Sequence, residues 1–275
     1  MVIDEVVRKV RRRLRRGGRA ARAKVAHTDV EAAAAPATPG LWDLLGPYIP
    51  TDHARQVNAR YYLDEVMSGQ DPPRRVLDLG CGAGNSVDLF RRHDPEIDWV
   101  GVDIEDSQEA RARRRTDAAF IAYDGVRVPF PDHTFDLVYS SQVLEHVPDP
   151  QQHLREIARV LRAGGVLVGS TSQLEPYHSM SYWNITPFGF VALARGAGMQ
   201  VRELRPGIDG ITLTLRSFLG RPSGFDAWWE TESPLNSEID TWGRETGRRA
   251  ALVNLRKLHM CGQYAFLVTR ETADA

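Results

Sequence analysis

The chain has 275 residues, of which 42% are hydrophobic and 26% are charged, and its formal net charge is −1. This length allows one large domain, or one domain with appendages, built around a substantial core. Two cysteines, Cys81 and Cys261, exclude a disulfide scaffold, and no apolar run approaches the length of a membrane span or of a signal-peptide core. Composition therefore predicts a soluble protein of the reducing cytoplasm.

The first part of the chain differs in charge from the rest. Residues 1–24 carry ten Lys or Arg against Asp4 and Glu5, whereas the remainder has 25 basic and 34 acidic residues. Apolar residues recur at helical spacing between these arginines, which suits a basic amphipathic helix lying on the inner face of a membrane. A solvated tail is the favoured alternative, and nucleic-acid binding is not expected. With an Ala/Pro/Thr-rich linker over residues 30–40, the sequence predicts a tail over 1–40 and a domain over 41–275.

Strand and helix patterns alternate through the domain, which predicts a doubly wound α/β sheet. One or two helices over residues 41–68 should precede the sheet and cover its ligand. His53, Arg60 and Tyr61 are candidates to contact that ligand, and the alternative is that they are ordinary helix-surface residues. Strands are expected near 75–80, 98–103, 118–123, 135–140, 165–171, 200–206 and 259–269, with helices near 84–92, 106–115, 150–162 and 187–197. Gly164 and Gly165 should end the helix that begins at 150.

The most informative motif follows the first expected strand. Residues 76–85 read VLDLGCGAGN, and Asp103 ends the next apolar run, WVGVDI. Such a turn over the carboxyl ends of parallel strands suits a nucleoside ligand. Gly80, Gly82 and Gly84 let the backbone approach the ligand closely, and Asp103 can accept hydrogen bonds from a ribose diol.

The turn departs from the dinucleotide-binding pattern. That pattern has glycine at its first, third and sixth positions, whereas the sixth position here is Asn85. Asp78, just before the turn, would repel a pyrophosphate but attract an ammonium group. A ligand with an amino-acid cation at one end and adenosine at the other therefore fits better than a nicotinamide dinucleotide.

With the stretch 124–170, which contains LEHVPDP, these motifs resemble the class I S-adenosylmethionine-dependent methyltransferases of the small-molecule branch. The resemblance covers about residues 74–205. It implies a Rossmann-like, seven-stranded sheet whose last strand is antiparallel and lies between the two preceding strands. It also implies that S-adenosylmethionine is the cofactor.

The resemblance also assigns roles to residues. Asp78 and the turn over residues 80–84 would hold the methionine part of the cofactor. Asp103 would bind the ribose, and Ile104 would pack on the adenine. The remaining implied contacts are Asp124 and Gly125 at the adenine edge, and Ser141 and Gln142 at the methionine end.

Two insertions point to the methyl acceptor. Residues 173–186 contain Tyr177, His178, Tyr182 and Trp183, and residues 208–257 separate strands that usually form a near-direct hairpin, so both are expected to form a lid. Aromatic side chains beside carboxylates suit carbohydrates. The chain is similar to actinobacterial methyltransferases of sugars and polysaccharides, which implies O-methylation of a sugar, oligosaccharide or polysaccharide. A hydroxyl of a polyketide or another secondary metabolite is the alternative.

A hydroxyl acceptor requires a base, because it is a poor nucleophile. The first candidate for this general base is His146, in the LEHV motif, and the alternative is that His146 only shapes the pocket. His178 is the second candidate for the base. No recognised metal-ligand spacing is present, so Mg²⁺ is a minority interpretation. A nicotinamide-dependent oxidoreductase and a non-catalytic nucleoside-binding protein remain as other classes. A homodimer is compatible with the sequence.

Overall fold

The structure is a computed structural model that describes residues 40–271. The interpretations of residues 1–39, including the basic helix and most of the linker, lie outside the described residues. The chain divides into two units, Met1–Leu44 and Leu45–Ala275. Of the first unit, residues 40–44 are described; they begin helix α2 (Leu41–Leu45), where Asp43 Oδ2 accepts a hydrogen bond from the Gly40 amide at 2.8 Å. Within residues 40–271 no helix has the length and apolar character needed to cross a bilayer.

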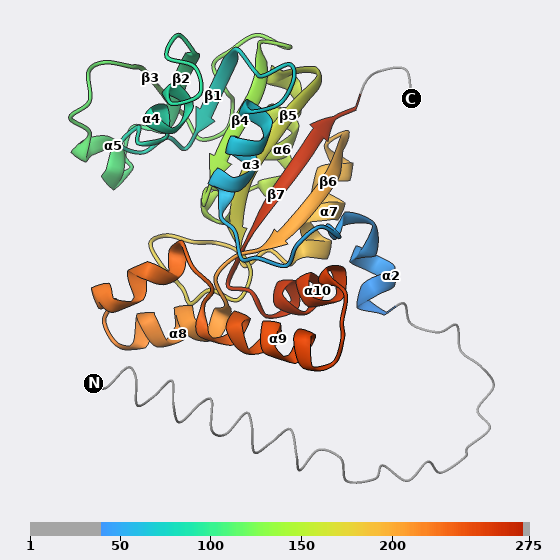
Figure 1. Ribbon diagram of the computed structural model, residues 1–275. Helices are drawn as coiled ribbons and strands as arrows, with labels where there is room; N and C mark the ends of the chain where they lie inside the picture. Colours follow the sequence, from blue (N-terminus) through green and yellow to red (C-terminus); the bar gives the residue numbers. More distant parts are fainter. Residues whose placement is uncertain (1–39, 272–275) are drawn as a thin grey trace, which may run out of the picture. The chain divides into compact units, whose positions relative to one another are not determined.

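The second unit is built on one seven-stranded sheet with strand order β3-β2-β1-β4-β5-β7-β6 (Figure 1). Strands β1 to β5 are parallel to their neighbours, whereas β7 runs antiparallel between β5 and β6. This order confirms the predicted Rossmann-like methyltransferase fold. The strands are β1 (Arg75–Leu79), β2 (Asp98–Ile104), β3 (Ala119–Tyr123), β4 (Phe135–Ser141), β5 (Leu161–Ser172), β6 (Met199–Pro206) and β7 (Gln263–Arg270).

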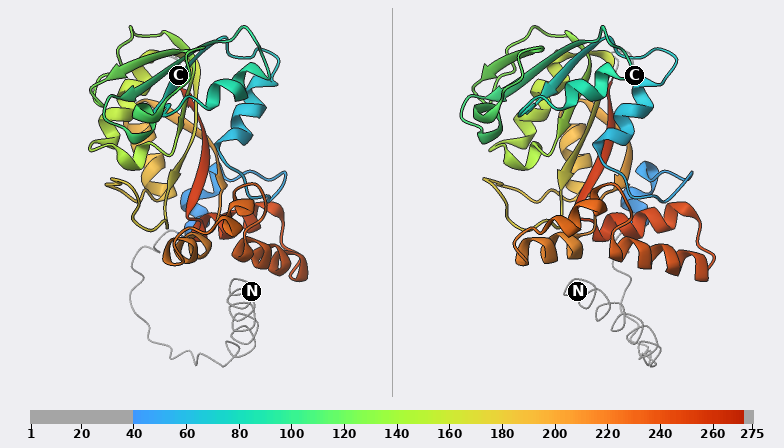
Figure 2. Two further views of the ribbon diagram at one scale, coloured as in Figure 1. Left: turned by 90° about the vertical axis from the view of Figure 1, so that its left-hand side faces the viewer. Right: turned by 60° about the vertical axis from the view of Figure 1, so that its left-hand side comes forward.

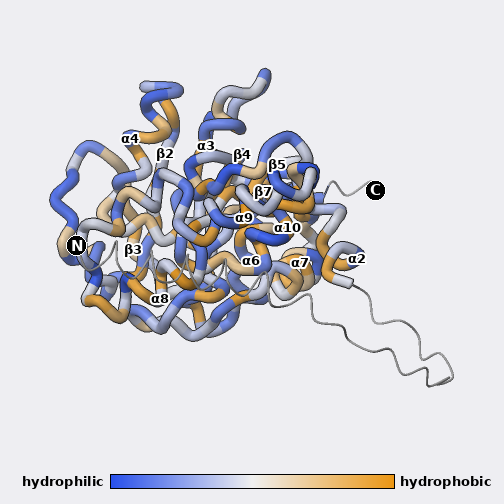
Figure 3. The backbone as a smooth tube through the Cα atoms, turned by 60° about the horizontal axis from the view of Figure 1, so that its bottom comes forward, coloured by the Kyte–Doolittle hydropathy of each residue, from blue (hydrophilic) through white to orange (hydrophobic). Residues whose placement is uncertain are grey.

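Helices cover both faces of the sheet (Figure 2). Helices α3 (Ala59–Met67) and α4 (Ser86–Arg91) bury Tyr62, Leu63 and Phe90 in one core layer, together with strand residues such as Leu137. Helices α6 (Pro150–Val160) and α7 (Pro187–Gly196) pack together on the opposite face. Helix α5 (Gln108–Ala112) is short and follows β2. Hydrophobic residues alternate with hydrophilic ones along the helices, which is the pattern of one-sided burial (Figure 3).

The helix starts follow from local sequence. Asp149 caps α6 by accepting a hydrogen bond from the Gln152 amide at 2.9 Å, and Thr186 caps α7 by accepting one from the Gly189 amide at 3.1 Å. Each cap precedes a proline, which lacks the amide hydrogen that a first helical residue would leave unpaired. Asn58 caps α3 by accepting a hydrogen bond from the Arg60 amide at 3.1 Å.

The expected long insertion before the last strand forms a helical subdomain. It comprises α8 (Gly210–Phe218), the 3-10 helix η3 (Ser223–Trp229), α9 (Pro234–Glu245) and α10 (Ala250–Met260). These helices lie beyond the end of the sheet at which the parallel strands finish (Figure 1). The wholly buried Lys257 joins its parts, because its ammonium donates to Ala54 O at 2.6 Å and lies 2.9 Å from Glu232 and 2.8 Å from Asp240.

Two predicted boundaries are wrong. Helix α6 ends at Val160, and Gly164 and Gly165 lie within β5, because Leu161 is extended and already pairs with Phe135. A register shift in this pair accommodates the glycines, and Gly164 has a φ of 71°. The last strand was expected from residue 259, but α10 continues to Met260 and β7 starts at Gln263.

Candidate active site

The predicted ligand residues follow the carboxyl ends of neighbouring parallel strands. Strand β1 pairs with β2 so that Asp78 lies opposite Gly101 and Leu79 opposite Val102. Strand β4 lies on the other side of β1 and ends at Ser141. Because parallel strands end at one edge of a sheet, the turns after β1, β2, β3 and β4 lie along the same edge.

The turn after β1 requires its glycines. Gly80, Gly82 and Gly84 have φ values of 81°, 49° and 79°. A Cβ on Gly80 would collide with the Val143 side chain, and one on Gly84 would lie 2.6 Å from the Phe120 ring. Side chains are therefore excluded by conformation and by contact, so the turn presents bare backbone at its surface. Its amides at residues 80, 81, 82 and 84 donate to Val102 O, Val102 O, Asp103 Oδ2 and Cys81 O, which holds the turn in this shape.

Asp78 is buried beneath this turn. The Ser86 hydroxyl donates a short hydrogen bond to its Oδ2, and the Trp99 indole donates to the Ser86 oxygen at 3.1 Å. Burial raises the pKa of Asp78 to about 7, and the Ser86 hydrogen bond opposes that shift. A buried carboxyl with this pKa ionises readily when a cation arrives, as the predicted contact with an ammonium group requires.

Asp103 lies across the turn from Asp78. Its Oδ2 accepts a hydrogen bond from the Gly82 amide at 2.6 Å, and its Oδ1 accepts one from the Ile104 amide at 2.8 Å. Each carboxylate oxygen has a second acceptor site, so the carboxylate can still accept a ribose diol. Asp103 thus joins the turn to the end of β2, as a shared nucleoside site requires.

The adenine-side residues lie at the ends of β2 and β3. Ile104 is 37% exposed, and a Cβ on Gly125 would lie 3.3 Å from its side chain, so the two residues are neighbours. Asp124 is exposed, and its Oδ1 accepts hydrogen bonds from the amides of Val126 and Arg127 at 2.9 and 2.8 Å. These amides hold the pKa of Asp124 below its ordinary value. The carboxylate therefore stabilises its own turn besides any adenine contact.

Arg113 is a contributor that the sequence did not reveal. Its Nε and Nη2 donate to the Gly82 carbonyl at 2.9 and 2.6 Å, and its guanidinium lies 4.0 Å from the centroid of the Phe120 ring. Phe120 in turn meets Trp99 edge-to-face at 5.5 Å. Arg113 and its aromatic support therefore hold the carbonyl of Gly82, while Asp103 holds the N–H of the same residue.

Gln142 lies at the predicted methionine end of the cofactor site, which we call the cradle and which comprises Asp78, residues 80–84, Asp103 and the residues after β3 and β4. Its φ is 59°, a left-handed conformation that is costly for a residue other than glycine, and its amide donates to Ser170 O at 2.9 Å. Ser141 lies beside it, with its hydroxyl 3.0 Å from the Ser170 hydroxyl. The strained position at the end of β4 is consistent with a residue held for function.

Beyond Gln142 lies the wholly buried Glu145. Its carboxylate accepts hydrogen bonds from the Thr171 and Ser172 hydroxyls at 2.9 and 3.1 Å. Burial raises the pKa of Glu145 above its ordinary value, although both hydroxyls and a backbone amide oppose the shift. Glu145 therefore fastens the loop after β4 onto the end of β5.

The two candidate bases lie together. The rings of His146 and His178 meet edge-to-face with centroids 5.2 Å apart. His178 Nδ1 lies 3.1 Å from Pro176 O and 3.8 Å from Glu175 Oε1. Burial lowers the pKa of the half-buried His146, and the neighbouring His178 lowers it further. A neutral imidazole, the form that accepts a proton, is thus favoured at His146 near neutral pH.

The described residues also offer one group that could hold a metal. The donor atoms of Glu145, His146 and His178 lie within 4.8 Å of one another. Mg²⁺ prefers an octahedron of oxygens, which two imidazoles and one carboxylate do not supply. This donor set therefore gives no support to the minority interpretation of an Mg²⁺ site.

Other candidates make contacts of their own. His53 lies 3.1 Å from the Tyr61 hydroxyl and adjoins the buried Arg205, and Arg60 pairs with Asp64 at 3.4 Å on the same helix.

In the inserted subdomain, Trp242 packs under the guanidinium of Arg256 at 3.9 Å. Trp228 and Trp229 pack against Phe225 and Arg216. These tryptophans serve internal packing, which leaves residues 173–186 as the main exposed aromatic segment.

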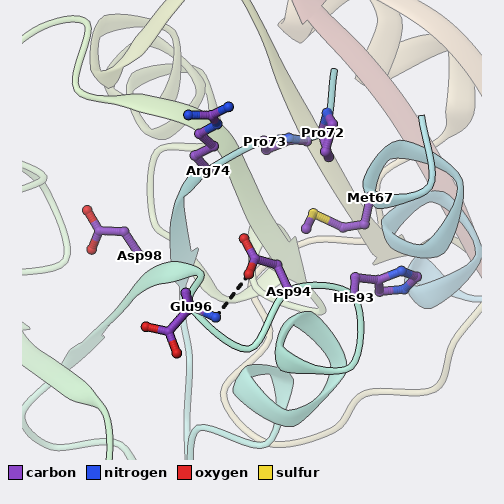
Figure 4. Close-up of a pocket in the computed structure, with 8 residues that line it drawn as sticks. All are labelled: Met67, Pro72, Pro73, Arg74, His93, Asp94, Glu96 and Asp98. Atoms are coloured by element: carbon purple, nitrogen blue, oxygen red, sulfur yellow. Dashed lines mark hydrogen bonds between the residues drawn. The ribbon is translucent and has the colours of Figure 1, made fainter. Parts of the chain in front are cut away.

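A surface pocket lies away from this site. It is lined by residues such as Met67, Arg74, His93 and Asp98 (Figure 4). Arg74 and Asp98 stand at the amino ends of β1 and β2, the edge opposite the glycine turn. The His93 side chain already interacts with Asp64, with 2.9 Å between His93 Nε2 and Asp64 Oδ1. The pocket therefore has no part in the proposed chemistry.

Comparison with known proteins defines the class. A family model described as "Methyltransferase domain" matches residues 77–169. The trans-aconitate 2-methyltransferase of Rhodopseudomonas palustris is 33% identical over 203 residues, which cover 73% of this chain and 71% of that protein. The chain therefore belongs to the class I S-adenosylmethionine-dependent methyltransferases, and S-adenosylmethionine is the cofactor of that family.

Other relatives show how varied the acceptors are. The 27-O-demethylrifamycin SV methyltransferase of Amycolatopsis mediterranei is 31% identical over 62% of this chain and 59% of its own length. The demethylmenaquinone methyltransferase of Beutenbergia cavernae is 40% identical over 40% of this chain and 45% of its length. The chain thus spans about half the length of several relatives. Their names do not point to sugars, so the sugar-directed resemblance stays a prediction.

A solved structure supports the fold alone. The crystal structure of the (4+2)-cyclase SpnF superposes on this chain with a TM-score of 0.50 and 19% sequence identity. The matched part covers 85% of this chain and 94% of the SpnF chain. The relatives above are methyltransferases, which argues against the nicotinamide-dependent alternative.

Proposed function

We propose that the chain transfers the methyl group of S-adenosylmethionine to a hydroxyl group of a small molecule, with a sugar, oligosaccharide or polysaccharide as the first candidate. The observation that carries this proposal is the pair formed by His146 and His178. His146 follows β4 at the sheet edge that carries the glycine turn, and His178 lies in the segment after β5. The pKa of the His146 imidazole is lowered. An amine or a carbanion would need no such base.

The cofactor would lie along the carboxyl edge of the sheet. Asp78 and the turn over residues 80–84 would hold its amino-acid end, and Asp103 would accept its ribose hydroxyls. Ile104, Asp124 and Gly125 would border its adenine. Ser141 and Gln142 would line the methionine end. When bound, the cofactor supplies an electrophilic methyl group on a sulfonium.

His146 would take the proton of the acceptor hydroxyl. In-line transfer depends mainly on positioning, and a hydroxyl additionally needs a neutral base as the new bond forms. The lowered pKa of His146 keeps its ring unprotonated near neutral pH. His178 is the alternative base, because Pro176 O and Glu175 lie on its Nδ1 side and fix the ring. The proton would then leave through the second imidazole or to solvent.

The acceptor class rests on the exposed aromatic segment. Tyr177 and Tyr182 are 75% and 59% exposed beside the two histidines, and aromatic faces of this kind can stack on sugar rings. A polyketide or another secondary metabolite is the second candidate. The specific support for it is the relative whose name gives 27-O-demethylrifamycin SV as its acceptor.

An acceptor screen with methyl-labelled S-adenosylmethionine tests the proposal. The panel should contain monosaccharides, oligosaccharides and polyketide aglycones, each with a free hydroxyl and in its O-methylated form, together with amines that lack a hydroxyl. Binding of S-adenosylhomocysteine is measured in parallel by calorimetry. Label should enter the free-hydroxyl compounds and not their O-methylated partners. Transfer to amines alone, or S-adenosylhomocysteine binding without transfer to any acceptor, would contradict the proposal; the second result would favour a non-catalytic nucleoside-binding protein.

A further inference from the structure

The segment after β5 exposes an unusual amount of apolar side chain. Five residues form what we term the apolar ledge, and their exposed fractions are 47%, 75%, 72%, 59% and 45% for Leu174, Tyr177, Met180, Tyr182 and Trp183, respectively. Isolated exposed apolar residues are common on proteins, but a group of them within ten residues marks a binding surface.

Hydrogen bonds hold this segment in place. The amides of Tyr182 and Trp183 donate to Glu145 O at 2.8 and 3.2 Å, and the Trp183 indole donates to Val147 O at 2.9 Å. At the end of the segment, the Ile185 amide donates to Ser172 O at 2.8 Å, and Ile185 O accepts from the Tyr264 hydroxyl at 3.1 Å. The backbone is thus fastened to β5, to β7 and to the loop after β4, while the side chains of the ledge remain exposed.

The ledge continues directly into the proposed catalytic pair. His178 lies within it, and the His146 ring hydrogen-bonds the backbone of Met180. Leu174 lies against Gly210 at the start of α8, which joins the ledge to the inserted subdomain. A molecule that presents a hydroxyl to His146 would therefore cover the ledge with the rest of its body.

Charge restricts what that molecule is. Residues 176–194 contain no Asp, Glu, Lys or Arg. The carboxylates that act on His146 are Glu175 and Glu109, and the buried Glu145 is adjacent. An anionic acceptor would meet these acids without a cation on the ledge to balance them, whereas an uncharged apolar body would bury apolar surface at no electrostatic cost.

We infer that the methyl acceptor is an uncharged, amphipathic molecule whose hydroxyl end lies at His146 and His178 and whose apolar body covers the ledge. The inference rests on the proposed function and narrows its acceptor class. A free, wholly polar sugar would leave the ledge exposed, whereas a sugar with an apolar aglycone, or a polyketide, would cover it.

The test uses three probes with the full chain saturated with S-adenosylhomocysteine. Calorimetry compares glucose, hexyl β-D-glucoside and hexyl β-D-glucuronide. We expect the hexyl glucoside to bind about tenfold more tightly than glucose, because burying about two methylene groups gives roughly that factor. It should also bind about tenfold more tightly than the hexyl glucuronide, because the carboxylate of the glucuronide would meet the acids around His146. The double substitution Tyr177→Ala and Met180→Ala should remove most of this preference. The control Ile121→Ala truncates a partly exposed side chain on β3 and should not change it.

Several outcomes would overturn the inference. They are equal binding of glucose and hexyl glucoside, no binding of either, or equal binding of the glucuronide. A fourth is a double variant that binds hexyl glucoside normally but no longer sediments with phosphatidylglycerol vesicles, which would assign the ledge to a membrane surface. Failure of the proposed function is seen separately, as the absence of labelled product from every hydroxyl acceptor.

Discussion

At the scale of single residues, the two acids of the cradle differ in their surroundings. Asp78 is buried with one hydroxyl partner, whereas Asp103 accepts two backbone amides. The first is therefore poised between its neutral and ionised forms near pH 7, and the second is held in place by the turn itself. These differences lead to different expectations for pH and for mutation.

Cofactor binding should be linked to proton release at Asp78. With a pKa of about 7, this carboxyl is mostly protonated at pH 5.5, and the ammonium group of the cofactor favours its ionised form. Affinity for S-adenosylhomocysteine should therefore rise between pH 5.5 and 7, by at most about tenfold per pH unit, and then level off. Calorimetry in buffers of different ionisation enthalpy measures the released proton. Asp78→Asn should abolish the release, and an unchanged pH dependence in that variant would refute the assignment.

Asp103→Ala should weaken the binding of S-adenosylhomocysteine by about 10- to 100-fold, because hydrogen bonds to a charged group contribute about 1.5–3 kcal/mol. The substitution also releases the Gly82 amide. Asp106→Ala is the control, since Asp106 pairs only with the exposed Arg111 on the same connection. Equal affinities of the Asp103 variant and the wild type, measured by calorimetry, would remove Asp103 from the ribose site.

At the scale of elements, the connection between β2 and β3 supports the glycine turn. Arg113 donates twice to the Gly82 carbonyl and stacks on Phe120, which contacts Trp99. Trp99 in turn donates to Ser86, the partner of Asp78. Asp78 and Asp103, the acids proposed for the methionine and ribose ends of the cofactor, are thus connected through one set of contacts.

Arg113→Met should therefore raise the dissociation constant for the cofactor about tenfold and leave turnover at saturating cofactor nearly unchanged. Methionine keeps apolar contact with Phe120 but cannot donate to Gly82 O. Arg111→Met, in the exposed arginine that pairs with Asp106, serves as the matched control. Initial rates over a range of cofactor concentrations separate the two parameters. A loss of turnover without a change in cofactor affinity would show that Arg113 does not act through the turn.

The inserted subdomain depends on Lys257. Its ammonium is buried with Glu232, Asp240 and the Ala54 carbonyl. Lys257→Met would leave two partly buried carboxylates without their cation, so we expect a loss of about 3 kcal/mol in unfolding free energy. Arg111→Met, which breaks an exposed pair with Asp106, should cost less than about 1 kcal/mol. Urea denaturation compares the two variants, and equal losses would contradict the structural role given to Lys257.

At the scale of the whole molecule, local patterns predicted the sheet well, and they indicated that the glycine turn and its two acids lie together. Asp78, the three glycines and Asp103 are close in sequence and belong to two adjacent strands, so their spacing was sufficient. The strand order with β7 between β5 and β6 followed from the family resemblance. The final strand was placed too early because residues 250–269 are apolar in both their helical and their extended parts.

Other features depend on contacts between distant segments. Arg113 looked like one of several arginines in a charged run, and only the fold brings its guanidinium to the Gly82 carbonyl. Ser86 lies under Asp78 because α4 packs on β1. His146 meets His178 because the segment after β5 lies against the loop after β4. Residues 208–257 were expected to form part of a lid, and the tryptophans at 228, 229 and 242 pack against side chains of that subdomain.

The central claim is methyl transfer to a hydroxyl group with His146 as the base. The most direct test compares wild type and His146→Ala in single-turnover transfer of labelled methyl to the acceptor found by the screen, with S-adenosylhomocysteine affinity measured in parallel. We predict a rate lower by about 10²–10⁴-fold, as expected for the loss of a general base, with cofactor affinity changed less than about threefold. A wild-type rate in the variant across the pH range would contradict the account.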